Sequence, residues 1–69
     1  MIAGTVNYLD LEGGFYGIVD GKNNYDPIDL PEDFQIDGLR VFVIARISKS
    51  QTSFHMWGTI IQIEFIIRI

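Results

Sequence analysis

Asp10 and Glu12 are the first candidates for catalytic chemistry in this 69-residue chain. Residues two positions apart point to the same face of a strand, so the two carboxylates could act as an acid and base pair. Carboxylates are mostly solvated, however, and these two stand beside a glycine turn. Nucleophilic and zinc chemistry have little basis, because the chain has no cysteine and a single histidine, His55, which we expect to pack within a strand. We therefore predict no enzyme activity, no catalytic residue, no metal site and no cofactor.

Residues 20–24 contain the aspartate, glycine and asparagines of a calcium-binding loop. Lys22 occupies a position where an oxygen ligand is required, and no closing glutamate follows at the right spacing. We therefore interpret the segment as a turn between two strands.

Aromatic side chains are better candidates for binding than the acids are. Exposed rings stack against bases or sugar faces, whereas buried rings contribute a large area to the core of a small domain. Six rings exceed what five short strands need for packing: Tyr8, Phe15, Tyr16, Tyr25, Phe42 and Trp57. Among them we single out Tyr16, Phe42 and Trp57, the last at a bend where a large residue can close one end of a barrel.

Charge is distributed unevenly along the chain, whose net charge is −4. Residues 1–37 hold eight acids and one base, a sum of −7, and residues 38–69 hold four bases and one acid, a sum of +3. Either the two halves lie against each other and neutralise, or the surface is polarised toward a charged partner. Arg40, Arg46 and Lys49 are the candidates for contacts with nucleic acid. An acidic chain repels polyphosphate, so nucleic acid is disfavoured as a partner.

The apolar C-terminal run, residues 59–69, does not predict a membrane span. It is eleven residues long and is interrupted by Gln62, Glu64 and Arg68, whereas a spanning helix needs about 20 apolar residues. The N-terminus also lacks the basic region of a signal peptide. We expect a single domain, residues 1–69, that is cytoplasmic and has no membrane partner.

Two adjacent glycines, Gly13 and Gly14, predict a hairpin between strands over residues 2–11 and 15–20. Glycine takes the positive φ that tight primed turns require, so we expect both at the centre of a two-residue turn. This pairing places four apolar residues in one buried patch: Leu9, Leu11, Tyr16 and Ile18. The apolar positions of the first strand change from even to odd, which predicts a bulge near residues 7–8.

The middle of the chain predicts a short third strand and a single helical turn. The strand contains Tyr25 and is limited by Pro27, which cannot donate a ladder hydrogen bond. The turn covers residues 30–34. Its apolar side chains, Leu30 and Phe34, are expected to plug one end of a barrel together with Ile36.

Regular alternation over residues 39–48 predicts the fourth strand. Five apolar side chains form its inner face. The outer face carries Arg40, Phe42, Ile44 and Arg46.

A polar loop is expected over residues 49–53, followed by a last strand over residues 54–69 that bends at Gly58. Ile60 and Ile66 are expected on the less buried side of this strand. The odd-numbered residues are expected to share the other face: Ile61, Ile63, Phe65, Ile67 and Ile69.

Five short strands with one helical turn predict an all-β fold. Twelve isoleucines against two alanines favour strands over helices, because β-branched side chains fit a pleated, half-buried surface. We predict a small five-stranded, partly open Greek-key barrel of the oligonucleotide/oligosaccharide-binding (OB) kind. An SH3-like barrel is the alternative.

Three motifs run through the chain: Glu12-Gly13-Gly14-Phe15-Tyr16-Gly17, then Leu30-Pro31 with Phe34 and Gly38-Leu39-x-Val41, then Met56-Trp57-Gly58-Thr59. In these motifs the chain resembles a family of small uncharacterised prokaryotic domains, which occur alone or inside bacterial lipoproteins. The resemblance covers nearly the whole chain and implies an OB-like barrel. It implies no established activity and offers no functional residue to transfer. The lipoprotein signal is lacking, so a membrane anchor is not implied.

These patterns predict a binding module. We expect it to dock a protein, or to associate weakly with itself, through the apolar outer face of the fourth strand. Binding of oligosaccharide or single-stranded nucleic acid is the alternative. The candidate binding residues are Tyr16, Arg40, Phe42, Ile44, Arg46 and Trp57.

Overall fold

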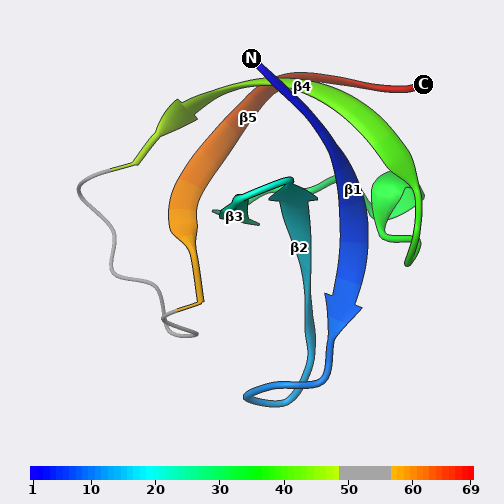
Figure 1. Cartoon of the computed structure of the whole chain (residues 1–69), viewed down its shortest axis with the longest axis vertical. Coiled ribbons are helices and arrows are strands. Elements are labelled where there is room, and N and C mark those ends of the chain that lie inside the picture. Colours follow the sequence, from blue (N-terminus) through cyan, green and yellow to red (C-terminus); the bar gives the residue numbers. More distant parts are fainter. Residues whose placement is uncertain (49–56) are drawn as a thin grey trace.

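A computed structural model describes residues 1–48 and 57–69. The predicted loop over residues 49–53 and the predicted strand position of His55 lie outside the described residues. Within the described part, five strands and one 3-10 turn form a closed all-β barrel (Figure 1). The elements are β1 (Ile2–Leu9), β2 (Phe15–Asp20), β3 (Asn23–Pro27), η1 (Glu32–Phe34), β4 (Arg40–Ile47) and β5 (Thr59–Arg68). No helix in that part is long and apolar enough to cross a membrane.

β1 closes the barrel because it pairs along both of its edges. Residues 5–9 pair with β2, and residues 2–5 pair with β4. β5 lies between β3 and β4, parallel to the first and antiparallel to the second. The order β1-β2-β3-β5-β4 is a Greek-key arrangement of the OB type, which confirms the predicted fold class. The barrel is closed and not partly open, because β3 pairs with β5.

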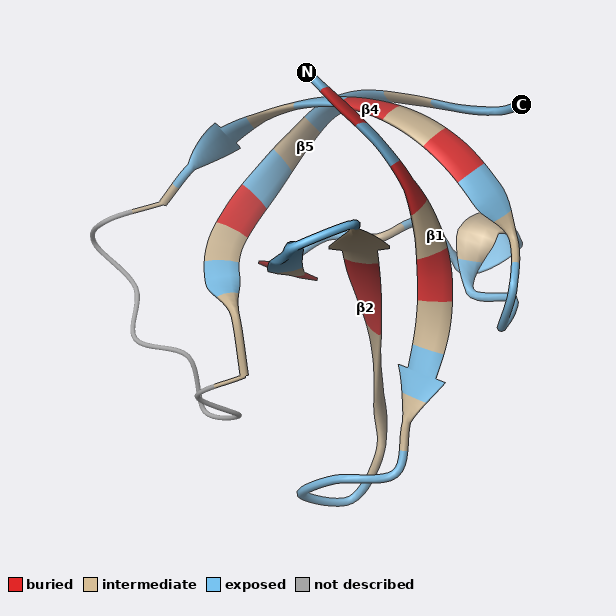
Figure 2. Ribbon diagram, viewed as in Figure 1, coloured by how far each residue is buried: buried red, intermediate tan, exposed pale blue. Residues whose placement is uncertain are grey.

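The core consists of aliphatic side chains that point into the barrel. Among the described residues, six hydrophobic side chains are buried: Ile2, Val6, Ile18, Val41, Val43 and Ile61. Along β1 and β4 they alternate with less buried residues (Figure 2), as expected for strands with one face toward the core. Leu30 and Phe34 pack against this core as predicted, whereas Ile36 is 46% exposed and remains on the surface.

The connection between β1 and β2 contains five residues, 10–14, and not the predicted two. Its turn is centred on Glu12 and Gly13, which have positive φ of 47° and 90°. Across this turn, Gly14 N donates to Leu11 O at 2.7 Å. The turn is therefore shifted by one residue from the prediction, and Glu12 takes a backbone conformation that we expected of a glycine.

The predicted buried patch of this hairpin divides between two faces. Tyr16 and Ile18 face the barrel interior. Leu9 lies on the outer face, and Leu11 is 49% exposed. The predicted bulge in β1 is wrong, because the register with β2 is unbroken over residues 5–9. The apolar residues at even and odd positions of β1 simply pack on opposite sides of the sheet.

The bulge occurs instead between β4 and β5. Ile44 pairs with Phe65, and Ala45 pairs with Ile63. This register leaves Glu64 as an extra residue in β5. A β-bulge of this kind bends its strand and changes which residues point inward beyond it.

The predicted common face of the last strand is therefore wrong beyond Glu64. β5 begins directly after the predicted bend at Gly58, and Ile61 is buried. After the bulge, Ile66 packs against the core, where we had expected the odd-numbered residues. Three apolar side chains are exposed as a result: Phe65, Ile67 and Ile69.

Candidate functional site

Four of the six predicted binding residues lie on the outer face of β4: Arg40, Phe42, Ile44 and Arg46. They point outward because the residues between them, Val41 and Val43, are buried in the core. Neighbouring strands extend this surface, since Phe42 pairs with Ala3 of β1 and with Ile67 of β5, and Ile44 pairs with Phe65. We call the five apolar residues the β4–β5 face: Ala3, Phe42, Ile44, Phe65 and Ile67.

The β4–β5 face exposes large apolar side chains next to one another. Ile44 is 42% exposed, Phe65 49% and Ile67 42%. The half-buried Phe42 lies beside Ile67. Single exposed apolar residues are ordinary, but adjoining ones on one sheet face are typical of an interaction surface.

Charged residues border the β4–β5 face at both ends. Arg40 is exposed at one end. At the other end, Arg46 Nε donates to Glu64 Oε2 at 2.9 Å. Both side chains of this ion pair are well exposed, so it contributes at most about 1 kcal/mol to stability. The arrangement is an apolar centre with a charged rim, as in protein interfaces.

Trp57 lies apart from the β4–β5 face, on the outer side of the β1–β2 hairpin. A Cβ atom at Gly17 would come within 2.3 Å of the Trp57 ring, so the glycine is needed for this close packing. Phe15 contacts the indole edge-on, with ring centroids 5.7 Å apart. The half-buried Trp57 thus covers the hairpin and does not close a barrel end.

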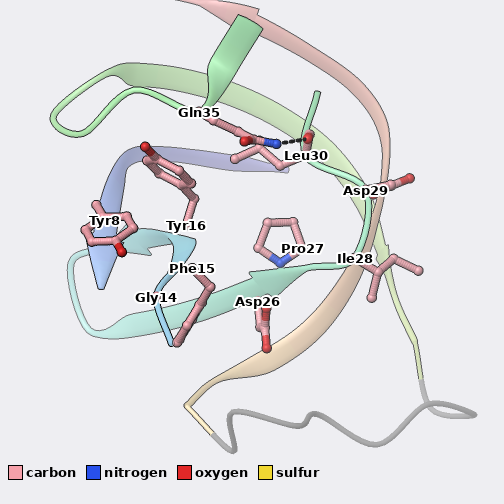
Figure 3. Close-up of a pocket in the computed structure, with 10 residues that line it drawn as sticks. All are labelled: Tyr8, Gly14, Phe15, Tyr16, Asp26, Pro27, Ile28, Asp29, Leu30 and Gln35. Carbon is pink, nitrogen blue, oxygen red and sulfur yellow. Dashed lines mark hydrogen bonds between the residues drawn. The ribbon is translucent and has the colours of Figure 1, made fainter. Parts of the chain in front are cut away.

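Tyr16 lines a cavity of about 380 Å³ between β2, β3 and the chain that leads to η1 (Figure 3). Tyr8 from β1 lies beside it, with the two ring centroids 5.2 Å apart and the ring planes at 63°. Pro27, Leu30 and Gln35 form the opposite side (Figure 3). The two rings therefore lie on opposite sides of β2: the Tyr16 ring lines the cavity, and the Trp57 ring packs over Gly17 on the outer side.

The cavity exists because β2 and β3 separate. Their pairing ends where Ile18 meets Tyr25. Continued, the same register would bring Gly17 opposite Asp26 and then Tyr16 opposite Pro27, and proline has no N–H to extend the ladder. Along its other edge, β3 pairs with β5 over residues 25–27. Tyr16 and Pro27 are left facing the opening.

Local hydrogen bonds hold the walls of the cavity. Tyr8 N donates to Asp37 Oδ1 at 2.7 Å, which extends the bonded edge of β1 beyond β4. Gln35 Nε2 donates to Leu30 O at 3.0 Å. Asp29 Oδ1 accepts from Ile63 N at 2.9 Å and ties the chain before η1 to β5.

Sequence reasoning missed part of each surface. Phe65 and Ile67 were assigned to the inner face, because no local signal marks Glu64 as a bulge. Tyr8 was counted only as a surplus ring. Pro27 was the one signal for the cavity, since it limits β3, while Gln35 carried no signal.

The carboxylates considered for acid and base chemistry lie in the exposed connection between β1 and β2. Asp10 and Glu12 are both exposed there. Among residues 1–48 and 57–69, no group of three or more histidine, cysteine or acidic side chains could hold a metal ion.

Comparisons of the chain with protein-family models, with curated proteins and with solved structures found no match. The family resemblance drawn from the motifs therefore stays a prediction.

Proposed function

We propose that this domain is a homotypic interaction module, in which the β4–β5 face of one copy packs against the same face of a second copy. The observation that supports the proposal is the row of exposed apolar side chains at Ile44, Phe65 and Ile67. Burying a large apolar side chain completely contributes roughly 1.5–3 kcal/mol before the costs of association are subtracted. A few such side chains support a weak dimer, with a Kd roughly between micromolar and millimolar.

The charged rim favours a second copy as the partner. Arg40 is at one end of the β4–β5 face, and Glu64 is at the other, beside Arg46. A two-fold axis that runs β4 antiparallel to β4 of the second copy brings Arg40 toward the Arg46–Glu64 ion pair of that copy, where Glu64 is the attractive partner. The axis repeats the contact, so every favourable pair in such an interface occurs twice.

The small size of the domain also favours self-association. A chain of about 60 residues buries only about 60% of the surface that its unfolded form exposes. Domains of this size commonly gain stability from disulfides, metals or oligomerisation. This chain has no cysteine, so a disulfide is not available to it.

Sedimentation velocity over a series of protein concentrations tests the proposal. We expect the wild type to show a rising sedimentation coefficient with concentration. Phe65→Ser should remain folded and monomeric, because Phe65 is 49% exposed and lies at the centre of the β4–β5 face. Leu11→Ser is the matched control, since Leu11 is equally exposed but lies in the β1–β2 connection. It should associate as the wild type does.

Two results would contradict the proposal. One is a wild type that sediments as a monomer at every concentration. The other is an equal loss of association in Phe65→Ser and Leu11→Ser, which would indicate non-specific apolar contact.

A further inference from the structure

We propose that the cavity between β2, β3 and the chain leading to η1 binds an organic ammonium group, with Tyr8 and Tyr16 as its aromatic walls. The cavity shares no residue with the β4–β5 face, so this site is independent of the homotypic interface. Its volume of about 380 Å³ lies within the range of small-molecule pockets, roughly 300–1,000 Å³.

The two tyrosine rings supply the recognition. Their planes meet at 63° with centroids 5.2 Å apart, so they form two walls of a corner and not one flat surface. Tyr8 is 47% exposed, which leaves much of its ring open to a ligand. The face of an aromatic ring carries partial negative charge and attracts a cation placed over it.

The remaining lining suits the alkyl groups of an ammonium ion. Pro27 and Leu30 present apolar surface across from the tyrosines (Figure 3). Gln35 Nε2 donates one hydrogen bond to Leu30 O, and the Oε1 of the same amide adds an acceptor for a ligand. Among the described residues, no lysine or arginine lines the cavity.

Charge selects a cation over an anion. The two segments that border the cavity, residues 10–14 and 28–35, hold five acids and no base. The carboxylates of Asp26 and Asp29 point away from the space between Tyr16 and Leu30 in Figure 3, and Asp29 accepts from Ile63 N. Asp26 and Asp29 therefore act on a ligand through their field and not by contact. The same field repels phosphate groups.

An amide-shift NMR titration of the full chain tests the site with three probes. Choline carries the quaternary ammonium group, 3,3-dimethylbutan-1-ol is its uncharged isostere, and inorganic phosphate is the anion. We expect choline to shift the amides around Tyr8, Tyr16 and Leu30 and to bind about 3- to 30-fold more tightly than the isostere. Phosphate should cause no shift at these positions.

Variants separate cation–π binding from a general loss of structure. Tyr8→Leu should weaken choline binding about 3- to 30-fold, whereas Tyr8→Phe should retain it, because phenylalanine keeps the ring face. Asp29→Asn keeps the acceptor for Ile63 N and removes one charge, so it should weaken choline binding by less than Tyr8→Leu does. Phe65→Ser, on the β4–β5 face, should bind choline as the wild type does.

The ammonium group can come from a free amine or from a methylated lysine side chain. Titration with a short peptide amide that contains trimethyllysine separates these sources. If the peptide binds more tightly than choline, the ligand of the cavity is a methylated lysine side chain. If choline binds more tightly, the ligand is a free amine. The proposal is overturned if choline does not shift these amides, if the isostere binds as tightly as choline, if phosphate binds at the cavity, or if Tyr8→Leu leaves the choline affinity unchanged.

Discussion

At the level of single residues, Gly14 sets the position of one cavity wall. Its φ is +94°, a conformation that side chains with a Cβ rarely adopt. A Cβ atom there would lie 2.0 Å from the Tyr8 hydroxyl. The backbone conformation therefore favours glycine at this position. The Tyr8 hydroxyl is the end of an exposed side chain, so a Cβ at position 14 would displace Tyr8 from its place at the cavity.

Gly14→Val should destabilise the domain far more than Asn24→Ala. Valine at positive φ is strained and also collides with Tyr8, so we expect a loss of about 2–4 kcal/mol in the free energy of unfolding. Asn24 is exposed in β3, and its replacement should cost less than about 1 kcal/mol. Urea unfolding of the two variants measures both losses. Similar unfolding midpoints would show that the turn does not need glycine at position 14.

At the level of elements, the bulge in β5 takes up Glu64 while Phe65 and Ile67 stay on the β4–β5 face. Ile63 points inward before it, and Ile66 points inward after it. Without the extra residue, the inward positions would still be Ile63 and Ile66, because deleting Glu64 restores simple alternation. Glu64 therefore adds a bend and a surface carboxylate, and no side chain of the core depends on it.

Deletion of Glu64 should leave the domain folded, whereas deletion of Phe42 should unfold it. Loss of Glu64 removes a surface ion pair with Arg46, and we expect a cost below about 2 kcal/mol. Loss of Phe42 turns Val43 outward and directs Arg46 toward the core, since a one-residue slip reverses both faces of a strand. Circular dichroism melting curves distinguish the variants. A well-folded Phe42 deletion would contradict the register of β4.

Much of this arrangement could be predicted from the sequence, but the partner of each strand could not. β4 was predictable because Val41 and Val43 alternate with charged and larger residues. β5 was not, because isoleucines occupy both odd and even positions, and either face fits a buried pattern until the pairing with β4 is known. The turn at Glu12 was missed because a non-glycine residue rarely takes positive φ.

The cavity was the least predictable feature. Tyr8 and Tyr16 pair across the β1–β2 hairpin, but Leu30 lies in the connection between β3 and η1 and reaches them only through the long-range pairing of the barrel. Pro27 signalled that β3 is short, but its effect depends on which residue stands opposite it. The sequence thus shows which side chains could bind a ligand. Which of them lie together in the cavity depends on the strand pairing of the barrel.

At the level of the whole molecule, the arginines do not form an open basic groove. Arg46 pairs with Glu64. Arg68 lies over the Phe34 ring at 5.8 Å and donates to Asp33 O at 3.1 Å. Arg40 is exposed at one end of the β4–β5 face, beside Thr5 of β1. The net charge of −4 surrounds these cations with a repulsive field for polyphosphate.

We therefore expect no appreciable binding of single-stranded or duplex DNA at physiological salt. Any affinity should be weaker than about 10⁻⁴ M, the weak limit of typical non-specific binding. Fluorescence anisotropy of labelled oligonucleotides, repeated at low and high salt, provides the measurement. Micromolar binding that weakens steeply with salt would show that the cations act together after all, and would favour nucleic acid as the ligand.

Amide chemical shifts recorded at increasing protein concentration test the homotypic interface most directly. If two β4–β5 faces pack together, the amides of Ala3, Phe42, Ile44, Phe65 and Ile67 shift with concentration, and those around Tyr16 and Pro27 do not. The shifts should follow one dimerisation curve and disappear in Phe65→Ser. Two results would contradict the account. One is chemical shifts that stay constant up to about 1 mM, a limit that corresponds to a free energy of association of only about 4 kcal/mol. The other is concentration-dependent shifts on β2 and β3.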